Sequence, residues 1–327
     1  MEKVARLPAR QRRELFSEAA ARLGMTPAVV EKDFWVTWVL DRLFATPTLS
    51  PLLMFKGGTS LSKVHGLIER FSEDIDLILD WRVLSEDAPL AKRSKTRQAE
   101  LNESINQHAR AYIAGPLLAA LRAATDGICQ CRIGDDDPHV IEVSYPAAFG
   151  DAYLRPELRL EIGPLAAWLP HEERLISAYA AQAFPDLFAR REAMVKVIRA
   201  ERTFWEKVTI LHQEAHRPEG KPQPARYSRH YYDLARLAAS PVKAAALADR
   251  ALLASVVEFK QRFYPRAWAC YDLATPGSLR LLPNEKALAA VAADYRAMEN
   301  MIFGQAPSFP GIVAELRALE NEINGKN

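Results

Sequence analysis

The first regular pattern of apolar residues predicts a helix, a strand and a tight turn. From Pro27 to about Phe44, most apolar side chains fall on one broad face at helical spacing. A short apolar run from Leu52 to Phe55 then enters Lys56-Gly57-Gly58, the pattern of a buried strand that ends in a tight turn. Thr59 to about Gly66 suits one short helix.

A second strand is predicted from Asp74 to Leu79, where polar and apolar residues alternate. Successive side chains of a strand point to opposite faces of a sheet. Asp74 and Asp76 are therefore expected on one face, and Ile75 and Leu77 on the other. The two aspartates become candidates for joint chemistry.

The rest of the chain divides into a mixed segment and a helical one. A long amphipathic helix is expected from about Lys95 to Ala124. The strand candidates that follow it are Ile128–Ile133, His139–Tyr145 and Glu157–Ile162. From about Pro164 the pattern is mostly helical, with helices expected at Ala200–His216, at Ser228–Ala238 and near 241–263, 284–300 and 309–325.

These elements predict an α/β (α+β) fold in two domains with the active site in the cleft between them. Residues 1–168 are expected to hold a small mixed sheet with helices, and residues 169–327 to form a mostly helical domain. A length of 327 residues is about twice a common domain size, which agrees with two cores. The boundary stays open, because Val195–Ile198 also suits an extra strand.

Composition places the chain among soluble globular proteins. It is 49% hydrophobic and 26% charged. Its net charge of +2 is close to neutral, so only a local cluster of basic residues can indicate a nucleic-acid partner. The charged start does not fit a signal peptide, and no stretch reaches the roughly 18–20 apolar residues of a membrane span. With three cysteines and no export signal, we expect a cytoplasmic protein with reduced thiols and no membrane contact.

The aspartate pair needs a neighbour that relieves its repulsion. Two carboxylates about 4 Å apart repel by roughly 4 kcal/mol at an effective dielectric near 20. A shared proton, a basic neighbour or a divalent metal would relieve this, and oxygen-only ligands suit Mg²⁺. The Gly57-Gly58 turn before a helix adds a place for phosphate, because glycine allows close approach and helix N-termini offer unpaired N–H groups. Each feature alone is common, but together they favour a metal-dependent nucleotide site.

The stretch Lys56-Gly-Gly-Thr-Ser-Leu-Ser-Lys63, followed by Arg70-Phe-Ser-Glu-Asp-Ile-Asp-Leu77, resembles the first motif of the AbiEii/AbiGii-type toxin family. Its members are nucleotidyltransferase-fold proteins of type IV toxin–antitoxin and abortive-infection systems, within the DNA polymerase β-like superfamily. The resemblance continues in the right order at Leu160–Gly163, Glu201–Lys207 and Arg229–Leu234. Four ordered blocks make it specific.

The resemblance implies a metal site. Asp74 and Asp76 would hold Mg²⁺ or Mn²⁺, and Glu161 lies where the superfamily often places a third carboxylate. For that third position, Glu161, Glu142 and no carboxylate at all remain open.

The resemblance also implies contacts with the nucleotide. The residues implied to bind it are Gly57, Gly58, Thr59, Ser72 and Lys207. Lys207 would bind the triphosphate, and Asp233 would complete the catalytic set with Asp74 and Asp76. Without the resemblance, the charged positions around Lys207 and Asp233 fit solvated surface pairs better.

The expected activity is transfer of a nucleotide from an NTP to an RNA acceptor. The resemblance suggests the tRNA 3′ end as acceptor, growth arrest as outcome and a separately encoded antitoxin as partner. From Arg190 to Arg236 the chain has eleven Lys and Arg against six Asp and Glu, a net charge of +5 that suits RNA. A solvated basic face is an equal reading. Nucleotidylation of a protein side chain and a catalytically silent nucleotide-binding regulator remain alternatives.

Overall fold

The computed structural model describes residues 1–72, 74–150 and 155–326, which fold into two compact units. Unit 1 comprises Met1–Val64 and Ser72–Ile198, and unit 2 comprises His65–Phe71 and Arg199–Asn327. The sequence pattern placed a domain boundary near residue 168. The compact units divide after Ile198 instead, because the intervening residues add two strands to the sheet of unit 1.

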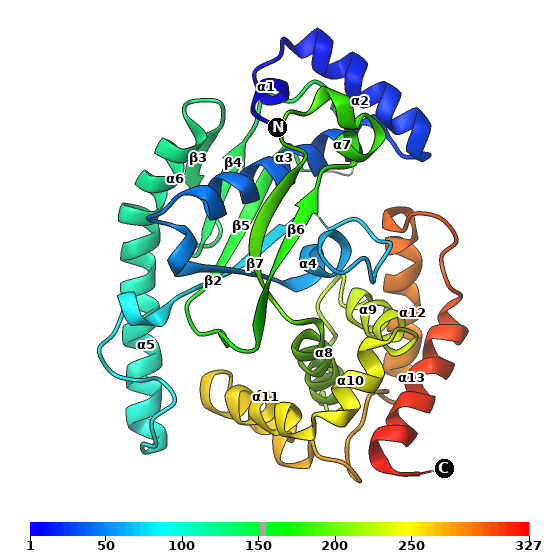
Figure 1. Cartoon of the computed structure of the whole chain (residues 1–327). Helices are drawn as coiled ribbons and strands as arrows, with labels where there is room; N and C mark the ends of the chain where they lie inside the picture. Colours follow the sequence, from blue (N-terminus) through cyan, green and yellow to red (C-terminus); the bar gives the residue numbers. More distant parts are fainter. Residues whose placement is uncertain (73, 151–154, 327) are drawn as a thin grey trace. The chain divides into compact units, whose positions relative to one another are not determined.

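A seven-stranded mixed sheet forms the centre of unit 1 (Figure 1). Its strands, in order across the sheet, are β3 (Gln130–Ile133), β4 (Val140–Ser144), β5 (Glu157–Gly163), β2 (Asp74–Leu79), β1 (Leu53–Lys56), β7 (Glu192–Ile198) and β6 (His171–Ser177). Strand β2 runs antiparallel to β1 and parallel to β5, so it has a neighbour on each side. This architecture confirms the predicted α+β class.

Strands β6 and β7 lie in a region where the sequence pattern was mostly helical. They form an antiparallel ladder, and β7 also pairs in parallel with β1 through Val197 and Phe55. Val195 and Val197 of β7 are buried, while Met194 before them is half exposed. Strand β6 forms the edge of the sheet, and most of its residues are polar, so its sequence lacks the apolar pattern of a buried strand.

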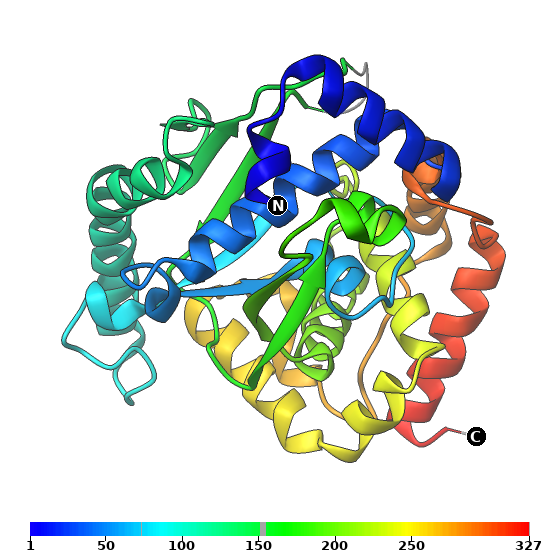
Figure 2. The ribbon, with the colours of Figure 1, turned by 45° about the horizontal axis from the view of Figure 1, so that its top comes forward.

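Helix α3 (Pro27–Ala45) packs on the sheet and is buried around most of its circumference (Figure 2). Thr26 caps its N-terminus, because its hydroxyl accepts a hydrogen bond from the amide of Val29. Helices α2 (Ala9–Leu23), α6 (Leu118–Thr125) and α7 (Tyr179–Ala183) pack against it. The long helix expected from Lys95 exists as α5 (Lys95–Tyr112) and α6, joined by a π-helical turn at Ile113–Leu117 that contains Pro116.

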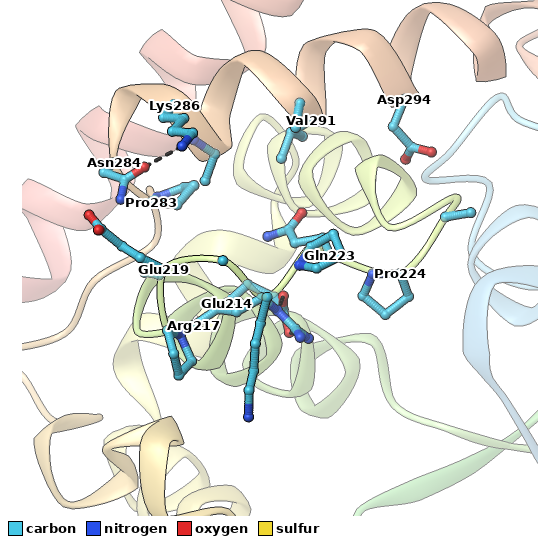
Figure 3. A pocket seen from close by; sticks show the side chains of 18 residues that line it. Glu214, Arg217, Glu219, Gln223, Pro224, Pro283, Asn284, Lys286, Val291 and Asp294 are labelled. Atoms are coloured by element: carbon cyan, nitrogen blue, oxygen red, sulfur yellow. Dashed lines mark hydrogen bonds and ion pairs between the residues drawn. The ribbon is translucent and has the colours of Figure 1, made fainter.

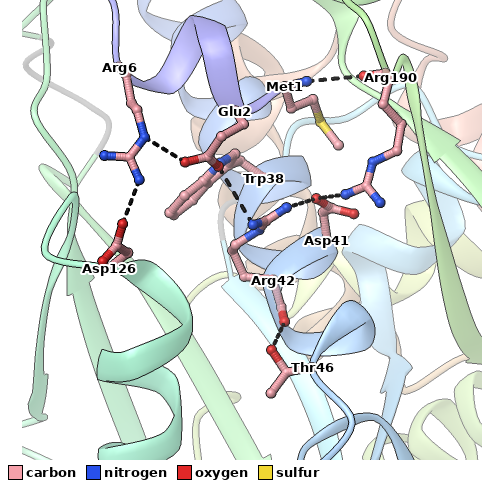
Figure 4. Close-up of polar contacts among 9 residues, drawn as sticks. All are labelled: Met1, Glu2, Arg6, Trp38, Asp41, Arg42, Thr46, Asp126 and Arg190. Atoms are coloured by element: carbon pink, nitrogen blue, oxygen red, sulfur yellow. Dashed lines mark hydrogen bonds and ion pairs between the residues drawn. The ribbon is translucent and has the colours of Figure 1, made fainter.

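Polar contacts tie the first residues of unit 1 to α3 and to the chain before β7 (Figure 4). Glu2 of α1 (Glu2–Ala5) accepts from Nε1 of Trp38 at 3.2 Å and pairs with Arg42 at 3.6 Å. The amino group of Met1 donates to the carbonyl of Arg190 at 3.0 Å. The first helix is therefore an integral part of this unit.

Unit 2 is helical. Its longer helices are α8 (Ala200–Ala215), α9 (Ser228–Ala238), α10 (Val242–Ala248), α11 (Arg250–Phe263), α12 (Glu285–Met298) and α13 (Phe309–Asn324). Helix α8 packs on α9, α10 and α11, and α9 packs on α12 and α13. Phe204, Trp205, Tyr231 and Tyr232 are at most 1% exposed and form the aromatic part of this core. Among the helices that the structure describes, none has the length and apolar character of a membrane span.

Candidate active site

The two aspartates share one face of β2, as the alternation predicted. Asp74 and Asp76 are half-buried, whereas Ile75 and Leu77 between and beyond them are fully buried. The buried hydroxyl of Thr59 lies within hydrogen-bonding distance of the carbonyl oxygens of Ser72 and Asp74. Thr59 therefore fixes the entry to this strand, and its hydroxyl is already used by the backbone.

Each aspartate faces a basic residue on a neighbouring strand. Lys56 lies opposite Asp76 in the β1–β2 ladder, with its Nζ 3.7 Å from Oδ1 of the aspartate. Arg159 lies opposite Asp74 in the β2–β5 ladder and is attracted by it. These cations reduce the repulsion between the carboxylates. A metal is thus not needed to stabilise the pair. The argument for a bound metal ion depends instead on the kind of donor atoms present.

Glu161 and Glu142 have different surroundings. Glu161 is exposed, lies opposite Asp76 in the parallel ladder and lines a pocket of about 220 Å³ together with it. Glu142 is 6% exposed and held between Arg132 and Arg159, at 2.5 and 3.3 Å. Both oxygens of Glu142 are committed to arginines, so Glu161 is the better candidate for the third carboxylate.

Gly57 allows the first turn of α4 (Gly57–Lys63) to pass close to Asp76. Its φ of +79° is disfavoured for other residues, and a Cβ there would lie 1.9 Å from Oδ2 of Asp76. Both facts require glycine at this position. Gly58, the next residue of α4, is buried, and Ser72 is half-buried.

The carboxylates fit Mg²⁺ in kind. Asp74, Asp76 and Glu161 offer oxygen donors only, which this ion prefers, and they lie on an accessible face. Among the described residues, no group of three or more His, Cys, Asp or Glu side chains is close enough to hold a metal. Mg²⁺ usually binds through one or two carboxylates together with substrate phosphates and water, so the two aspartates suffice.

His139 also lines the pocket of Asp76 and Glu161, and the sequence did not single it out. Its Nδ1 lies 3.3 Å from Oδ1 of Asp137, and its buried Nε2 has no hydrogen-bond partner among the residues described. A lone histidine before a short strand gives no spacing pattern. Only the pairing of β4 with β5 brings it to this pocket.

Lys207 and Asp233 meet in the interior of unit 2. Nζ of Lys207 donates to Oδ2 of Asp233 at 2.7 Å and to Nδ1 of His230 at 3.0 Å. Arg70 binds the same carboxylate through Nε at 2.7 Å and Nη2 at 2.8 Å. All four side chains are buried, so they are not solvated surface charges.

The protonation states in this cluster follow from its charges. Burial alone would raise the pKa of Asp233, but attraction by Arg70 and Lys207 brings it well below its ordinary value, so the carboxylate is ionised. Burial, and then repulsion by Lys207 and Arg229, lowers the pKa of His230 well below 6.5. His230 is therefore neutral and accepts the Lys207 proton donor at Nδ1.

The loop Arg217–Arg226, which joins α8 to α9, borders a separate pocket of about 350 Å³ in unit 2 (Figure 3). The loop, the end of α8 and the start of α12 line it, with apolar and charged side chains in similar number. Arg217 is paired with Glu214 at 2.6 Å, whereas Lys221 is exposed. Arg226, the last residue of the loop, is also exposed.

Comparisons with known proteins give the family of the chain and a solved structure to which it is similar. The family model described as "Nucleotidyl transferase AbiEii toxin, Type IV TA system" matches residues 38–318, a range that contains every site residue named above. Among solved structures, the chain is similar to MenT4, a nucleotidyltransferase toxin from Mycobacterium tuberculosis H37Rv. The two are 18% identical with a TM-score of 0.44, over 98% of this chain and 99% of that one. A search of the curated proteins finds no match.

Proposed function

The chain belongs to the AbiEii family of nucleotidyltransferase toxins of type IV toxin–antitoxin systems, and from this premise we propose that it transfers a nucleotide from an NTP to the 3′ end of tRNA. Membership makes it a nucleotidyltransferase and implies an NTP substrate and an antitoxin partner. The tRNA acceptor, the Mg²⁺ dependence and the resulting growth arrest are our proposal. A 3′-extended tRNA could not be charged normally, which accounts for toxicity.

Asp74 and Asp76 would hold Mg²⁺, with Glu161 as a third carboxylate on the same face. The bound metal would supply positive charge against the triphosphate and the charge that develops on it. The acceptor hydroxyl oxygen bonds to the α-phosphorus, the bond to the pyrophosphate oxygen breaks, and the hydroxyl proton is released. Lys56, opposite Asp76, holds that carboxylate in place.

The nucleotide contacts are proposed for the turn before α4 and for unit 2. Gly57, Gly58 and Ser72 would contact phosphate. Thr59 would contribute only through its backbone, because its hydroxyl is used by the strand entry. The ammonium group of Lys207 has three N–H donors, two of which go to Asp233 and His230, and we propose the third for a phosphate oxygen.

The observation that carries the proposal is one row of side chains across three strands. Lys56, Asp76 and Glu161 lie opposite one another on β1, β2 and β5, with Asp74 on the same face. Gly57 passes directly against Asp76. An accessible row of side chains with excess negative charge can bind a cation, and the glycine turn beside it can bind a phosphate. A sheet with a purely structural role does not require this arrangement.

The test is incubation with Mg²⁺, each labelled NTP and total cellular RNA, followed by sequencing of tRNA 3′ ends. We expect extended tRNA with the wild-type protein and none with Asp76→Asn. Asp186→Asn, at a side chain that is 96% exposed, is the matched control and should act like wild type. Label on protein alone would favour the protein-modifying alternative, and NTP binding without transfer the silent regulator.

A further inference from the structure

Lys56 is the cation in the row of side chains that crosses β1, β2 and β5, and the whole row belongs to unit 1. The side chain of Lys56 is 28% exposed and that of Asp76 is 25% exposed, so solvent reaches both. Nζ of Lys56 lies 3.7 Å from Oδ1 of Asp76, which is longer than a hydrogen bond. Charge therefore holds these two atoms together, and the flexible stem of lysine allows Nζ to move to another anion.

The charges of this row change balance when a divalent cation binds. Asp76 and Glu161 line the pocket of about 220 Å³ together with Lys56. Their two negative charges balance a divalent cation by themselves, and a cation bound between them repels a nearby ammonium group. Lys56 and the metal therefore compete for Asp76. The ammonium group that the metal displaces then needs another anion.

We propose that Lys56 is a catalytic residue that exchanges partners when the substrate binds. It pairs with Asp76 until a divalent cation takes the carboxylates, and it then binds the triphosphate of the NTP. Lys56 directly precedes Gly57 and Gly58, for which the proposed function assigns a phosphate contact. The proposal rests on that function, because the NTP is the second partner of Lys56. Metal and NTP then favour each other's binding, because metal alone must displace Lys56, whereas the triphosphate gives it a new partner.

The competition is tested by titration of the full chain with Mn²⁺ alone. Methionine keeps the apolar stem without the charge, so Lys56→Met should bind Mn²⁺ about tenfold more tightly than wild type, equivalent to about 1.4 kcal/mol. Lys56→Arg keeps the positive charge and should bind Mn²⁺ with an affinity close to that of wild type. Binding that remains in Asp76→Asn lies outside this site and is subtracted.

The variant that binds metal more tightly should react more slowly. At saturating Mn²⁺ we expect Lys56→Met to lower kcat by about tenfold to a hundredfold, because one positioned charge contact with the triphosphate is lost. Lys56→Arg should recover part of this loss. A side chain that only stabilised the fold would weaken metal binding and turnover together, so the opposite signs identify the exchange of partners.

Lys243→Met is the matched control. The side chain of Lys243 is 32% exposed and lies 3.1 Å from Glu322, so its replacement removes the same charge from an ion pair of similar exposure. The affinity for Mn²⁺ and kcat should both stay as in wild type. Changes equal to those of Lys56→Met would trace the effect to the net charge of the protein and overturn the proposal.

Two results at Lys56 would also overturn it. Unchanged or weaker Mn²⁺ binding in Lys56→Met means that Lys56 does not compete with the metal. Tighter Mn²⁺ binding with unchanged kcat means that Lys56 makes no contact with the triphosphate during the reaction. If the wild-type protein transfers no nucleotide, the proposed function and the triphosphate contact fail together. The titration with Mn²⁺ alone still decides whether Lys56 competes for Asp76, so the two failures are distinguishable.

Discussion

At the scale of single residues, two neighbouring rows of charged side chains across the sheet differ in net charge. In one row Asp74, Arg159, Glu142 and Arg132 alternate in sign across β2, β5, β4 and β3. Opposite charges on facing strand positions attract, so this row neutralises itself. In the next row, Asp76 and Glu161 carry two negative charges with Lys56 as the cation, which leaves an excess of one. The second row is the one that would gain most from a bound cation.

The two glutamates should therefore respond differently to removal of their charge. We expect Glu161→Gln to lower turnover by about tenfold or more, equivalent to about 1.4 kcal/mol of barrier, with an unchanged melting temperature. Glu142→Gln should lower the free energy of unfolding by about 1–3 kcal/mol, because buried Arg159 keeps Asp136 but loses the charge of its buried partner Glu142. Turnover and thermal unfolding of both variants check this. The reverse pattern would make Glu142 the third carboxylate.

At the scale of elements, sequence alone predicted those whose pattern is local. Strand β2 follows from the alternation of Asp74 to Leu79, and α3 from its apolar spacing. Helix α2 was not predicted from the sequence, and neither was edge strand β6, most of whose residues are polar. The pairs of side chains that meet across the sheet could not be predicted, because they join residues that are far apart in the chain. Arg159 opposite Asp74 depends on strand register, which no spacing encodes.

The start of α4 gives a prediction that combines backbone strain and steric overlap at Gly57. Gly57→Ala places a Cβ at 1.9 Å from Oδ2 of Asp76, in a backbone with φ of +79°. We expect loss of transferase activity and a stability loss above about 1 kcal/mol. Gly66→Ala is the matched control, since its φ is +61° but no described atom lies within 4 Å of the added Cβ. It should show the backbone strain of about 1–2 kcal/mol with activity retained. Equal activity losses in both would remove the special role of the Asp76 contact.

The packing of α8 on α9 gives a prediction about pH. His230 has a pKa well below 6.5 in the folded state, through burial and the positive charges of Lys207 and Arg229. Between that pKa and about 6.5 the unfolded chain binds a proton that the folded chain does not, so stability falls as the pH drops. The slope reaches about 1.4 kcal/mol per pH unit. His230→Asn, which keeps an acceptor for Lys207, should flatten the dependence of the melting temperature on pH between 4 and 6.5. Parallel curves for variant and wild type would contradict the assignment.

At the scale of the whole molecule, the basic segment Arg190–Arg236 is less available than its net charge of +5 indicates. Arg202 is buried against Glu206, Lys207 against Asp233, and Arg217 is paired with Glu214. Charges that are already paired release few counterions when RNA binds. The surface that RNA phosphates can reach is thus small. In α9 and the loop before it, its main members are the exposed Lys221 and Arg226 and the half-buried Arg229.

This limited surface predicts a shallow salt dependence of tRNA binding. A protein with six to ten phosphate contacts loses roughly a thousandfold to a hundred-thousandfold in affinity between 50 and 200 mM salt, with a log–log slope near −0.9 per contact. Three contacts predict a slope of about −3, a loss of about fortyfold over that range.

Lys221→Ala should reduce the slope by about one and weaken the binding of all tRNAs alike, because phosphate contacts carry no sequence information. Lys95→Ala, at an exposed lysine of α5, is the control and should leave the slope unchanged. Binding titrations with labelled tRNA at four salt concentrations measure this. A slope steeper than about −6 would require a phosphate-binding surface well beyond these residues, and an unchanged slope in Lys221→Ala would remove the loop from it.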